Sequence, residues 1–287
     1  MFNRKKEKLG LHLFIFLQFT FCFLQIQCTY GQKSIYGFFY DVKAVIDTSD
    51  HKIKTSDYMV LWSNEKYSVF QSYYGFENDN FKRVLSQKID ETGVIDATGF
   101  INEMKTRKKE SFTYKIHKNK SKKLISFHDK LFSDFYKYDQ DLGKLKWIIH
   151  SDEKDVLNMP AIRATTTYAG RNYIAWFTEK IPINDGPYIF HGLPGLIVEL
   201  YDEEEHYYFV LKEIEKREVE MSVIVPRKSI QVSRSEFLKT KRKHFANVAL
   251  GLPPHILSNM NAQQLKNLQE RYDRANNPLE LNVEDEF

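Results

Sequence analysis

Hydrophobic and polar side chains alternate along most of this chain with the period of two that is typical of β-strands. The alternation is most regular between residues 111 and 149, where short polar turns separate successive apolar runs. This pattern predicts an antiparallel meander with one solvated face. Other strands are expected over residues 33–46, 58–62, 66–74, 163–168, 171–178, 196–201, 206–214, 219–225 and 228–232.

The period changes towards that of a helix near the C-terminus. Residues 233–248 carry an apolar stripe at helical spacing, Ser233 or Ser235 is a suitable N-cap, and Gly251 to Pro254 ends the pattern. A second helix is expected over residues 261–275. The acidic tail, residues 280–287, is expected to fray.

Residues 78–107 fit neither pattern well. They are mixed and charged, they lack a strand period, and only weak helical spacing is present at Phe81, Val84 and Leu85. We expect a variable insertion or lobe here.

Together the elements predict a β-rich α+β fold. Its main part is a large, curved antiparallel sheet, a meander resembling a half-barrel, formed by residues 33–232. A sheet with one aromatic face must cover that face, so we expect the C-terminal helical segment, residues 233–276, to cover part of it.

Residues 1–31 have the pattern of a secretory signal: a basic start, an apolar run and a short polar end. Thr29 and Gly31 favour cleavage before Gln32, which leaves a single domain over residues 32–287 and no membrane span. Cleavage before a lipidated Cys28 and a retained anchor are the alternatives. We therefore expect an exported protein that is periplasmic, associated with the outer membrane, or secreted.

Composition and charge narrow the function classes. The 287 residues include 22 Phe and 17 Tyr, which favours a packed core. The leader holds four basic residues and one acidic residue, so its removal reduces 42 basic and 38 acidic residues to 38 and 37. A net charge of +1 gives no reason to expect a nucleic-acid partner. Both cysteines, Cys22 and Cys28, lie in the leader, which excludes thiol chemistry in the mature chain.

The segment Gly192-Leu193-Pro194-Gly195-Leu196-Ile197 is the most distinctive motif. Proline at the second position and glycine at the third predict a type II turn over residues 193–196, because Gly195 would supply the positive φ that this turn needs.

This motif resembles the signature of the GLPGLI family of exported and envelope proteins of Bacteroidetes. The resemblance is specific over residues 163–202. It includes Gly170-Arg171, Ala175-Trp176-Phe177-Thr178, Ile181-Pro182-Ile183, Gly186-Pro187 and Phe190. It implies a fold and a compartment but no reaction, since the family has no established activity. Many members have a cysteine near the position of Asn158 to Ile162, where this chain has none, so a thiol-based or disulfide-based function does not carry over.

The chain has no zincin, nucleophile-elbow, Walker or dinucleotide-binding motif, so we predict no catalytic residue, cofactor or metal. Arg171 is the most interesting charge. It would either hold a ligand carboxylate or pair with Asp185 or Asp202. Tyr173 and Trp176 should lie on opposite faces of their strand, and Trp176 would either line a groove or belong to the core.

His191 is the remaining candidate binding residue. His191 and His206, with Asp202 or Glu199, would offer a metal or acid–base set, although a histidine beside a turn is more often a half-buried structural side chain. The exposed amides of the turn would bind an anion or a peptide carbonyl; alternatively, these residues would serve only to form the turn.

Three functions remain open. The first is a non-enzymatic envelope protein that binds a peptide, a lipid or a protein near residues 192–197. The second is an envelope hydrolase or isomerase that uses Arg171, His191, Asp202 and His206, which requires these side chains to converge. The third is a structural subunit of an outer-membrane transport complex.

Overall fold

The computed structural model describes residues 35–52, 54–94, 96–143, 145–217 and 229–282. The predicted signal peptide and the strand predicted at 219–225 lie outside these residues. The residues from 35 onwards belong to one compact unit.

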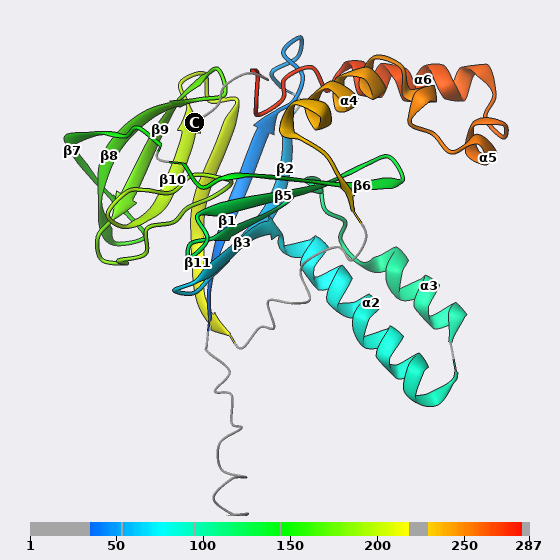
Figure 1. Ribbon diagram of the computed structural model, residues 1–287, viewed down its shortest axis with the longest axis horizontal. Helices are drawn as coiled ribbons and strands as arrows, with labels where there is room; N and C mark the ends of the chain where they lie inside the picture. Colours follow the sequence, from blue (N-terminus) through cyan, green and yellow to red (C-terminus); the bar gives the residue numbers. More distant parts are fainter. Residues whose placement is uncertain (1–34, 53, 95, 144, 218–228, 283–287) are drawn as a thin grey trace, which may run out of the picture. The chain divides into compact units, whose positions relative to one another are not determined.

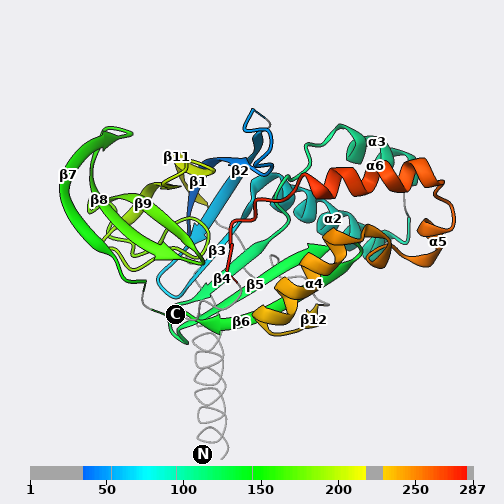
Figure 2. The same cartoon turned by 90° about the horizontal axis from the view of Figure 1, so that it is seen from above.

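The described residues form one sheet of 12 strands (Figures 1 and 2), and this confirms the β-rich α+β prediction. The strands are β1 (Ile35–Val45), β2 (Lys54–Ser63), β3 (Tyr67–Ser72), β4 (Lys115–Asn119), β5 (Leu124–Leu131), β6 (Asp134–Asp141), β7 (Ile148–Val156), β8 (Met159–Tyr168), β9 (Arg171–Thr178), β10 (Leu196–Asp202), β11 (Tyr207–Arg217) and β12 (Ile230–Gln231).

The strand order is β12-β6-β5-β4-β3-β2-β1-β11-β10-β9-β8-β7. Two antiparallel meanders, β1 to β6 and β7 to β11, therefore join where β1 pairs with β11. The short strand β12 lies within the strand predicted over residues 228–232 and runs parallel to β6.

The sheet has two hydrophobic cores, one on each face. The larger core is on the face that carries Tyr40, Phe70 and Phe177, which we call the inner face. On the opposite, outer face, Val60, Trp62 and Val69 form a smaller core.

The helices are α2 (Tyr73–Thr92), α3 (Ala97–Thr106), α4 (Arg234–Ala246), the 3-10 turn η2 (Val248–Leu250), α5 (Pro254–Leu257) and α6 (Ala262–Asp273). Helix α4 covers part of the inner face as expected, with Phe237 packed against Phe127 and Tyr138. Ser233 caps α4 and Asn261 caps α6, each in a capping box.

The region expected to be a variable lobe contains α2 and α3. The strand predicted over residues 66–74 ends at Ser72, because the side chain of Ser72 accepts a hydrogen bond from the Gly75 N–H and caps α2. Phe76 on α2 then packs on Trp62 of the outer face.

Strand β7 extends past residue 149 through a charged stretch in which the sequence pattern predicted no strand.

The predicted type II turn is wrong. Gly195 has no positive φ, whereas Gly192 does, at 103°. Gly195 is needed for a different reason: a Cβ there would lie 2.2 Å from the carbonyl oxygen of Thr178 on the neighbouring strand β9.

Residues 179–195 connect β9 to β10 and fill the inner face. Tyr188 packs on Phe127, and Phe190 packs on Tyr173 with ring centroids 4.5 Å apart. The connection bridges the two meanders across the sheet, because Tyr188 contacts a strand of the first and Phe190 a strand of the second.

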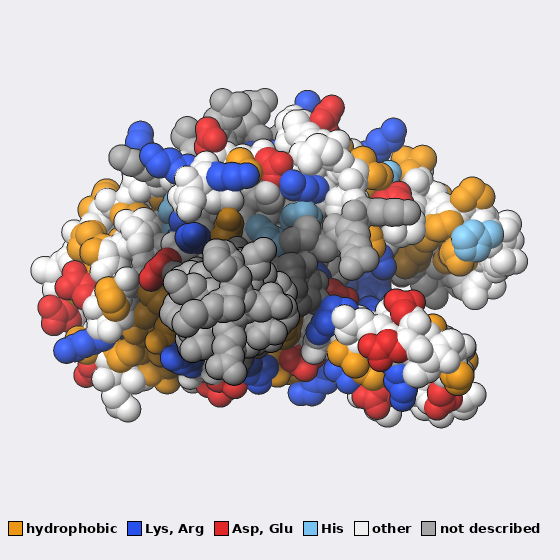
Figure 3. Space-filling model, turned by 60° about the horizontal axis from the view of Figure 1, so that its bottom comes forward, with side chains coloured by type: hydrophobic (Ala, Val, Ile, Leu, Met, Phe, Trp, Pro, Cys, Tyr) orange, Lys and Arg blue, Asp and Glu red, His pale blue; other side chains and the backbone are white. Residues whose placement is uncertain are grey.

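Among the described residues, no helix combines the length and the apolar character needed to cross a membrane. Figure 3 shows acidic and basic side chains interspersed over one side of the molecule, as the near-balance of charge leads one to expect.

Candidate functional site

Arg171 opens strand β9 immediately after a two-residue hairpin turn. Ala169 and Gly170 in this turn have φ values of 48° and 82°, as a type I′ turn requires. Tyr168 and Arg171 are partners across the hairpin and lie on the inner face. The strands predicted over residues 163–168 and 171–178 are thus confirmed. The hairpin between them places the guanidinium of Arg171, with 5% of the residue exposed, at the end of the sheet.

The two terminal nitrogens of the Arg171 guanidinium bind different parts of the chain. Nη1 donates to Asp202 Oδ2 at 2.8 Å, which is one of the two pairings foreseen. Nη2 donates to the side-chain oxygen of Asn277 and to the backbone carbonyl of Pro278, at 2.8 Å for the latter. Arg171 thereby connects the β9–β10 pair to a segment more than a hundred residues later.

That segment is residues 276–282, which we call the C-terminal segment. Figure 2 shows it in red, leaving α6 and running over the sheet. Tyr207 donates to the carbonyl of Asn277 at 2.6 Å, and Tyr173 donates to the carbonyl of Leu279 at 3.3 Å. The segment crosses the ends of β1, β11, β9 and β8, since it also bonds the carbonyls of Val45, Ile46 and Ala169.

Glu280 is the charged residue of this segment, and its side chain is buried. Its Oε1 accepts hydrogen bonds from the hydroxyls of Tyr168 at 3.1 Å and Tyr188 at 2.5 Å. Its Oε2 accepts from Nε and Nη2 of Arg234 at 3.1 and 2.7 Å. Glu280 is 6% exposed, so the expectation that residues from 280 onwards fray is wrong for Glu280.

The electrostatics of this pocket fit a bound carboxylate. Burial raises the pKa of the hydroxyls of Tyr168 and Tyr188, and the charge of Glu280 raises both pKa values further. Burial alone would lower the pKa of Arg234, but the attraction of Glu280 keeps it above its usual value. Both tyrosines therefore remain protonated donors and Arg234 remains charged at any physiological pH.

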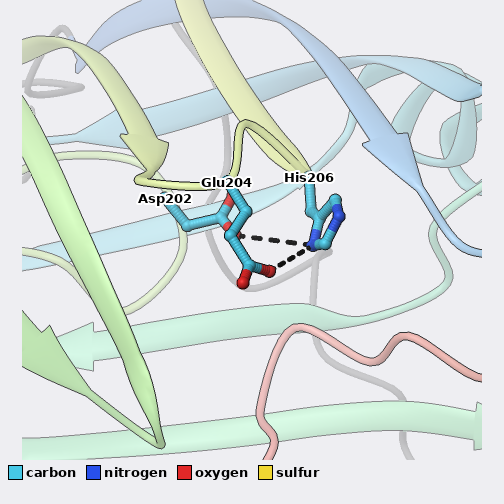
Figure 4. Close-up of side chains that lie close together, drawn as sticks. All are labelled: Asp202, Glu204 and His206. Atoms are coloured by element: carbon cyan, nitrogen blue, oxygen red, sulfur yellow. Dashed lines mark ion pairs between the residues drawn. The ribbon is translucent and has the colours of Figure 1, made fainter. Parts of the chain in front are cut away.

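Asp202, Glu204 and His206 form the group of described residues whose ligand atoms would suit a metal (Figure 4). His206 Nδ1 lies 3.0 Å from Glu204 Oε2 and 3.9 Å from Asp202 Oδ2. Nη1 of Arg171, however, lies 2.8 Å from that same oxygen of Asp202 and 3.4 Å from His206 Nδ1. A divalent cation here would meet the arginine charge at short range, so the group is better described as the anionic surroundings of Arg171.

Trp176 lies on the other face of β9 from Tyr173, as predicted. The burial of β9 alternates, with Arg171, Tyr173, Ala175 and Phe177 buried on the inner face and Trp176 half-buried. Lys154 Nζ lies 4.4 Å from the Trp176 ring centroid and pairs with Glu199 at 2.7 Å. Trp176 therefore does not belong to the same site as Arg171 and Tyr173.

His191 is buried and makes its hydrogen bonds away from Arg171. Its Nδ1 faces the carbonyl of Ile189 at 2.9 Å, and its Nε2 faces the carbonyl of Gly143 at 2.9 Å. Burial, with the charge of Lys118, lowers the pKa of His191. Of the proposed acid–base set, Arg171, Asp202 and His206 meet, whereas none of the described bonds of His191 reaches them.

The signature segment is anchored by a buried ion pair that the sequence did not reveal. Lys118 Nζ donates to Asp185 Oδ1 at 2.7 Å and to the carbonyls of Gly186 and Phe190 at 2.8 and 3.0 Å. Burial raises the pKa of Asp185, but the charges of Lys118 and Lys120 outweigh it and hold that pKa below its usual range. Leu193, Gly195, Leu196 and Ile197 are buried, while Gly192 and Pro194 are exposed. The segment thus fills the core.

Sequence reasoning found Arg171 and Tyr173 but missed Tyr168, Tyr188, Tyr207, Arg234 and Glu280. Tyr168 and Tyr207 were interpreted as ordinary strand residues, Tyr188 lay outside every predicted element, and Glu280 was interpreted as part of a frayed acidic tail. The one available signal was Arg234, a charge at the first position of a helix that was expected to cover the sheet.

Comparison with known proteins adds a partial match to one family model and a similarity of fold. Residues 86–199 match the model of a family described as "Protein of unknown function (Porph_ging)". The match covers less than half of the chain. It fits the expectation of an uncharacterised family, while the GLPGLI name and the origin in Bacteroidetes stay predictions. No curated protein matches the chain.

Solved structures of PNGF-II in the C2 and P21 space groups resemble the chain, each with a TM-score of 0.50 and 12% sequence identity. The similarity covers 73% of this chain and 33% of those chains. At this identity the likeness shows the fold alone, and this chain spans about a third of their length.

Proposed function

We propose that the protein is a non-enzymatic, exported binding protein that holds an extended peptide across the strand ends of β1, β11, β9 and β8. One observation carries the proposal: Arg171, Tyr173 and Tyr207 donate to three successive backbone carbonyls, those of Pro278, Leu279 and Asn277. Donors aimed at backbone carbonyls suit any extended peptide, and the side-chain pockets beside them then add selectivity.

In the intact chain the C-terminal segment occupies this site. A tethered segment has an effective concentration on the order of millimolar, so a separate peptide must compete with it. The site proposed here lies beside Arg171 at the sheet end, whereas the signature segment supports it from within the core. The exported location rests on the predicted leader alone.

The test uses a protease site inserted between Arg274 and Ala275, just after α6. Cutting frees the C-terminal segment from its tether while leaving it bound. A fluorescent peptide with the sequence of residues 275–282 should then bind the cut protein, as measured by anisotropy, and bind the uncut protein far more weakly. Failure of the cut, folded protein to take up the peptide, or unfolding upon cutting as seen by circular dichroism, would contradict the proposal.

The hydrolase or isomerase alternative has less support. Asp202 already accepts from Arg171 through Oδ2 and from the Tyr207 N–H through Oδ1, at 2.8 and 2.6 Å, so its carboxylate is engaged in structural bonds. The transport-subunit alternative stays a prediction that no contact of the described residues favours.

A further inference from the structure

The surroundings of Glu280 have the features of a built carboxylate-binding pocket. Each carboxylate oxygen faces two donors, with hydroxyls on Oε1 and arginine N–H groups on Oε2. The side chains of Arg234 and Glu280 are 13% and 5% exposed. Charge-assisted hydrogen bonds of this kind are about twice as strong as neutral ones, and burial protects them from screening.

The donors of this pocket favour a carboxylate over a neutral side chain of the same shape, because the guanidinium of Arg234 donates only and carries a charge. A glutamine in place of Glu280 would direct an NH₂ group at either the tyrosine hydroxyls or the arginine. It would also leave the charge of Arg234 buried and unneutralised, which is costly. The pocket therefore discriminates by charge as well as by size.

A second recognition point lies three residues earlier. The side-chain oxygen of Asn277 accepts from Arg171, and its Nδ2 donates to the carbonyl of Val45 at 2.7 Å. Asn277 is 4% exposed, and its side chain is paired at both ends. Leu279 lies between the two points and is 9% exposed. Counted from Asn277, the site thus binds Asn at position one, an apolar residue at position three and Glu at position four of an extended peptide.

We infer that the physiological ligand is an extended peptide of a separate protein that carries an acidic side chain for the pocket of Tyr168, Tyr188 and Arg234. This inference rests on the proposed peptide-binding function and specifies the class of ligand. The C-terminal segment, with Asn277, Leu279 and Glu280, is the intramolecular competitor that has the same chemistry.

The test compares peptides on the protein cut after Arg274. The peptide of residues 275–282 is measured against the same peptide with Glu280→Gln, and against a control with Leu281→Ala, since Leu281 is 44% exposed. Loss of charged hydrogen bonds should weaken the Gln peptide by about 10- to 100-fold, while the control changes by less than about threefold.

Protein variants locate the effect. With Arg234→Gln, the Glu and Gln peptides should bind with nearly equal affinity, because the charge preference comes from this arginine. Tyr188→Phe should weaken the Glu peptide selectively. Thermal unfolding of each cut variant shows whether it is folded.

The outcomes separate the two proposals. If no peptide binds the folded cut protein, the peptide-binding function fails. If the Glu and Gln peptides bind the unsubstituted protein within about twofold, peptide binding stands and the carboxylate inference fails. A dimer of the intact protein that dissociates when the Glu peptide is added would show that a second copy supplies the segment, and would overturn the assignment to a separate partner.

Discussion

Arg171 and Gln71 show opposite uses of a buried polar side chain. The two Nη atoms of Arg171 donate to Asp202, Asn277 and the Pro278 carbonyl, and only its buried Nε has no partner among the described residues. Gln71 lies on β3 with 1% of its surface exposed, and neither end of its amide has a hydrogen-bond partner within the described part of the chain. Paired polar groups specify a structure, whereas unpaired ones reduce its stability.

Replacing Arg171 with lysine should destabilise the protein by about 2 kcal/mol, since lysine keeps the charge but loses the fork that reaches two partners. Urea unfolding measures the change. Arg163→Lys is the control, because Arg163 makes a more exposed contact of 3.5 Å with Asp152 and should change stability by less than about 0.5 kcal/mol. Equal losses in the two variants would show that the Arg171 network contributes little.

Replacing Gln71 with methionine should stabilise the protein by about 1 kcal/mol, because the change removes an unpaired amide and nearly keeps the volume. The exposed Gln263 is the control, and Gln263→Met should have almost no effect. A clear loss of stability in Gln71→Met would mean that the amide has a role that its contacts do not reveal.

At the scale of elements, close approach of backbones sets the positions of the strands around the signature segment. The connection from β9 to β10 returns so tightly that Gly195 lies against the carbonyl of Thr178. Gly186 is confined by a side chain instead, since a Cβ on Gly186 would lie 2.8 Å from the side-chain atoms Cβ and Cδ1 of Ile197.

Gly195→Ala should therefore destabilise the protein by about 1–3 kcal/mol, because backbone atoms must move to accept the methyl group. Gly75→Ala is the matched control: its Cβ would meet ordinary contacts from 3.5 Å outwards, and alanine favours the helix α2. Denaturant midpoints of both variants measure the difference. If Gly195→Ala were as stable as Gly75→Ala, the close approach would not be a constraint.

At the scale of the molecule, the two meanders are joined by the β1–β11 pairing and by two connections on the inner face. Residues 179–195 form one, and the C-terminal segment forms the other, from the end of β1 to β8. On the outer face, neighbouring strands carry His117 and His128, whose rings lie 5.3 Å apart.

Stability should fall as the pH drops below about 6.5. Burial lowers the pKa of His117 to about 3 and that of His128 to about 4. The charge of His128 adds to the shift of His117, and nearby lysines add to both shifts. Their folded pKa values lie below the unfolded ones, so the unfolded state takes up protons first. Each should lower the unfolding free energy by at most about 1.4 kcal/mol per pH unit until its folded pKa is reached.

Urea unfolding between pH 8 and pH 4 measures this slope. His128→Asn should reduce it, whatever its effect on stability at pH 8. An unchanged slope would show that His128 is protonated without cost in the folded protein.

The sequence predicts what local patterns determine. The strands on either side of Ala169-Gly170, the helix cap at Ser233 and the alternation of β9 all follow from neighbouring residues. Strand β7 was only partly predicted because Asp152, Glu153 and Asp155 give it no apolar period. The surroundings of Glu280 could not be predicted, because Tyr168 and Glu280 are 112 positions apart and only the folded sheet brings them together.

The central claim is that the C-terminal segment lies against the β8–β9 hairpin, and a disulfide tests it most directly. A Cβ on Gly170 would lie 3.7 Å from the Cβ of Asn282, within the range that a disulfide spans. In a chain with Cys22 and Cys28 replaced by serine, Gly170→Cys with Asn282→Cys should form an intramolecular disulfide, seen by mass spectrometry, while Gly170→Cys with Asn276→Cys should not. Free thiols in the first pair, or equal cross-linking in both, would contradict this position of the segment.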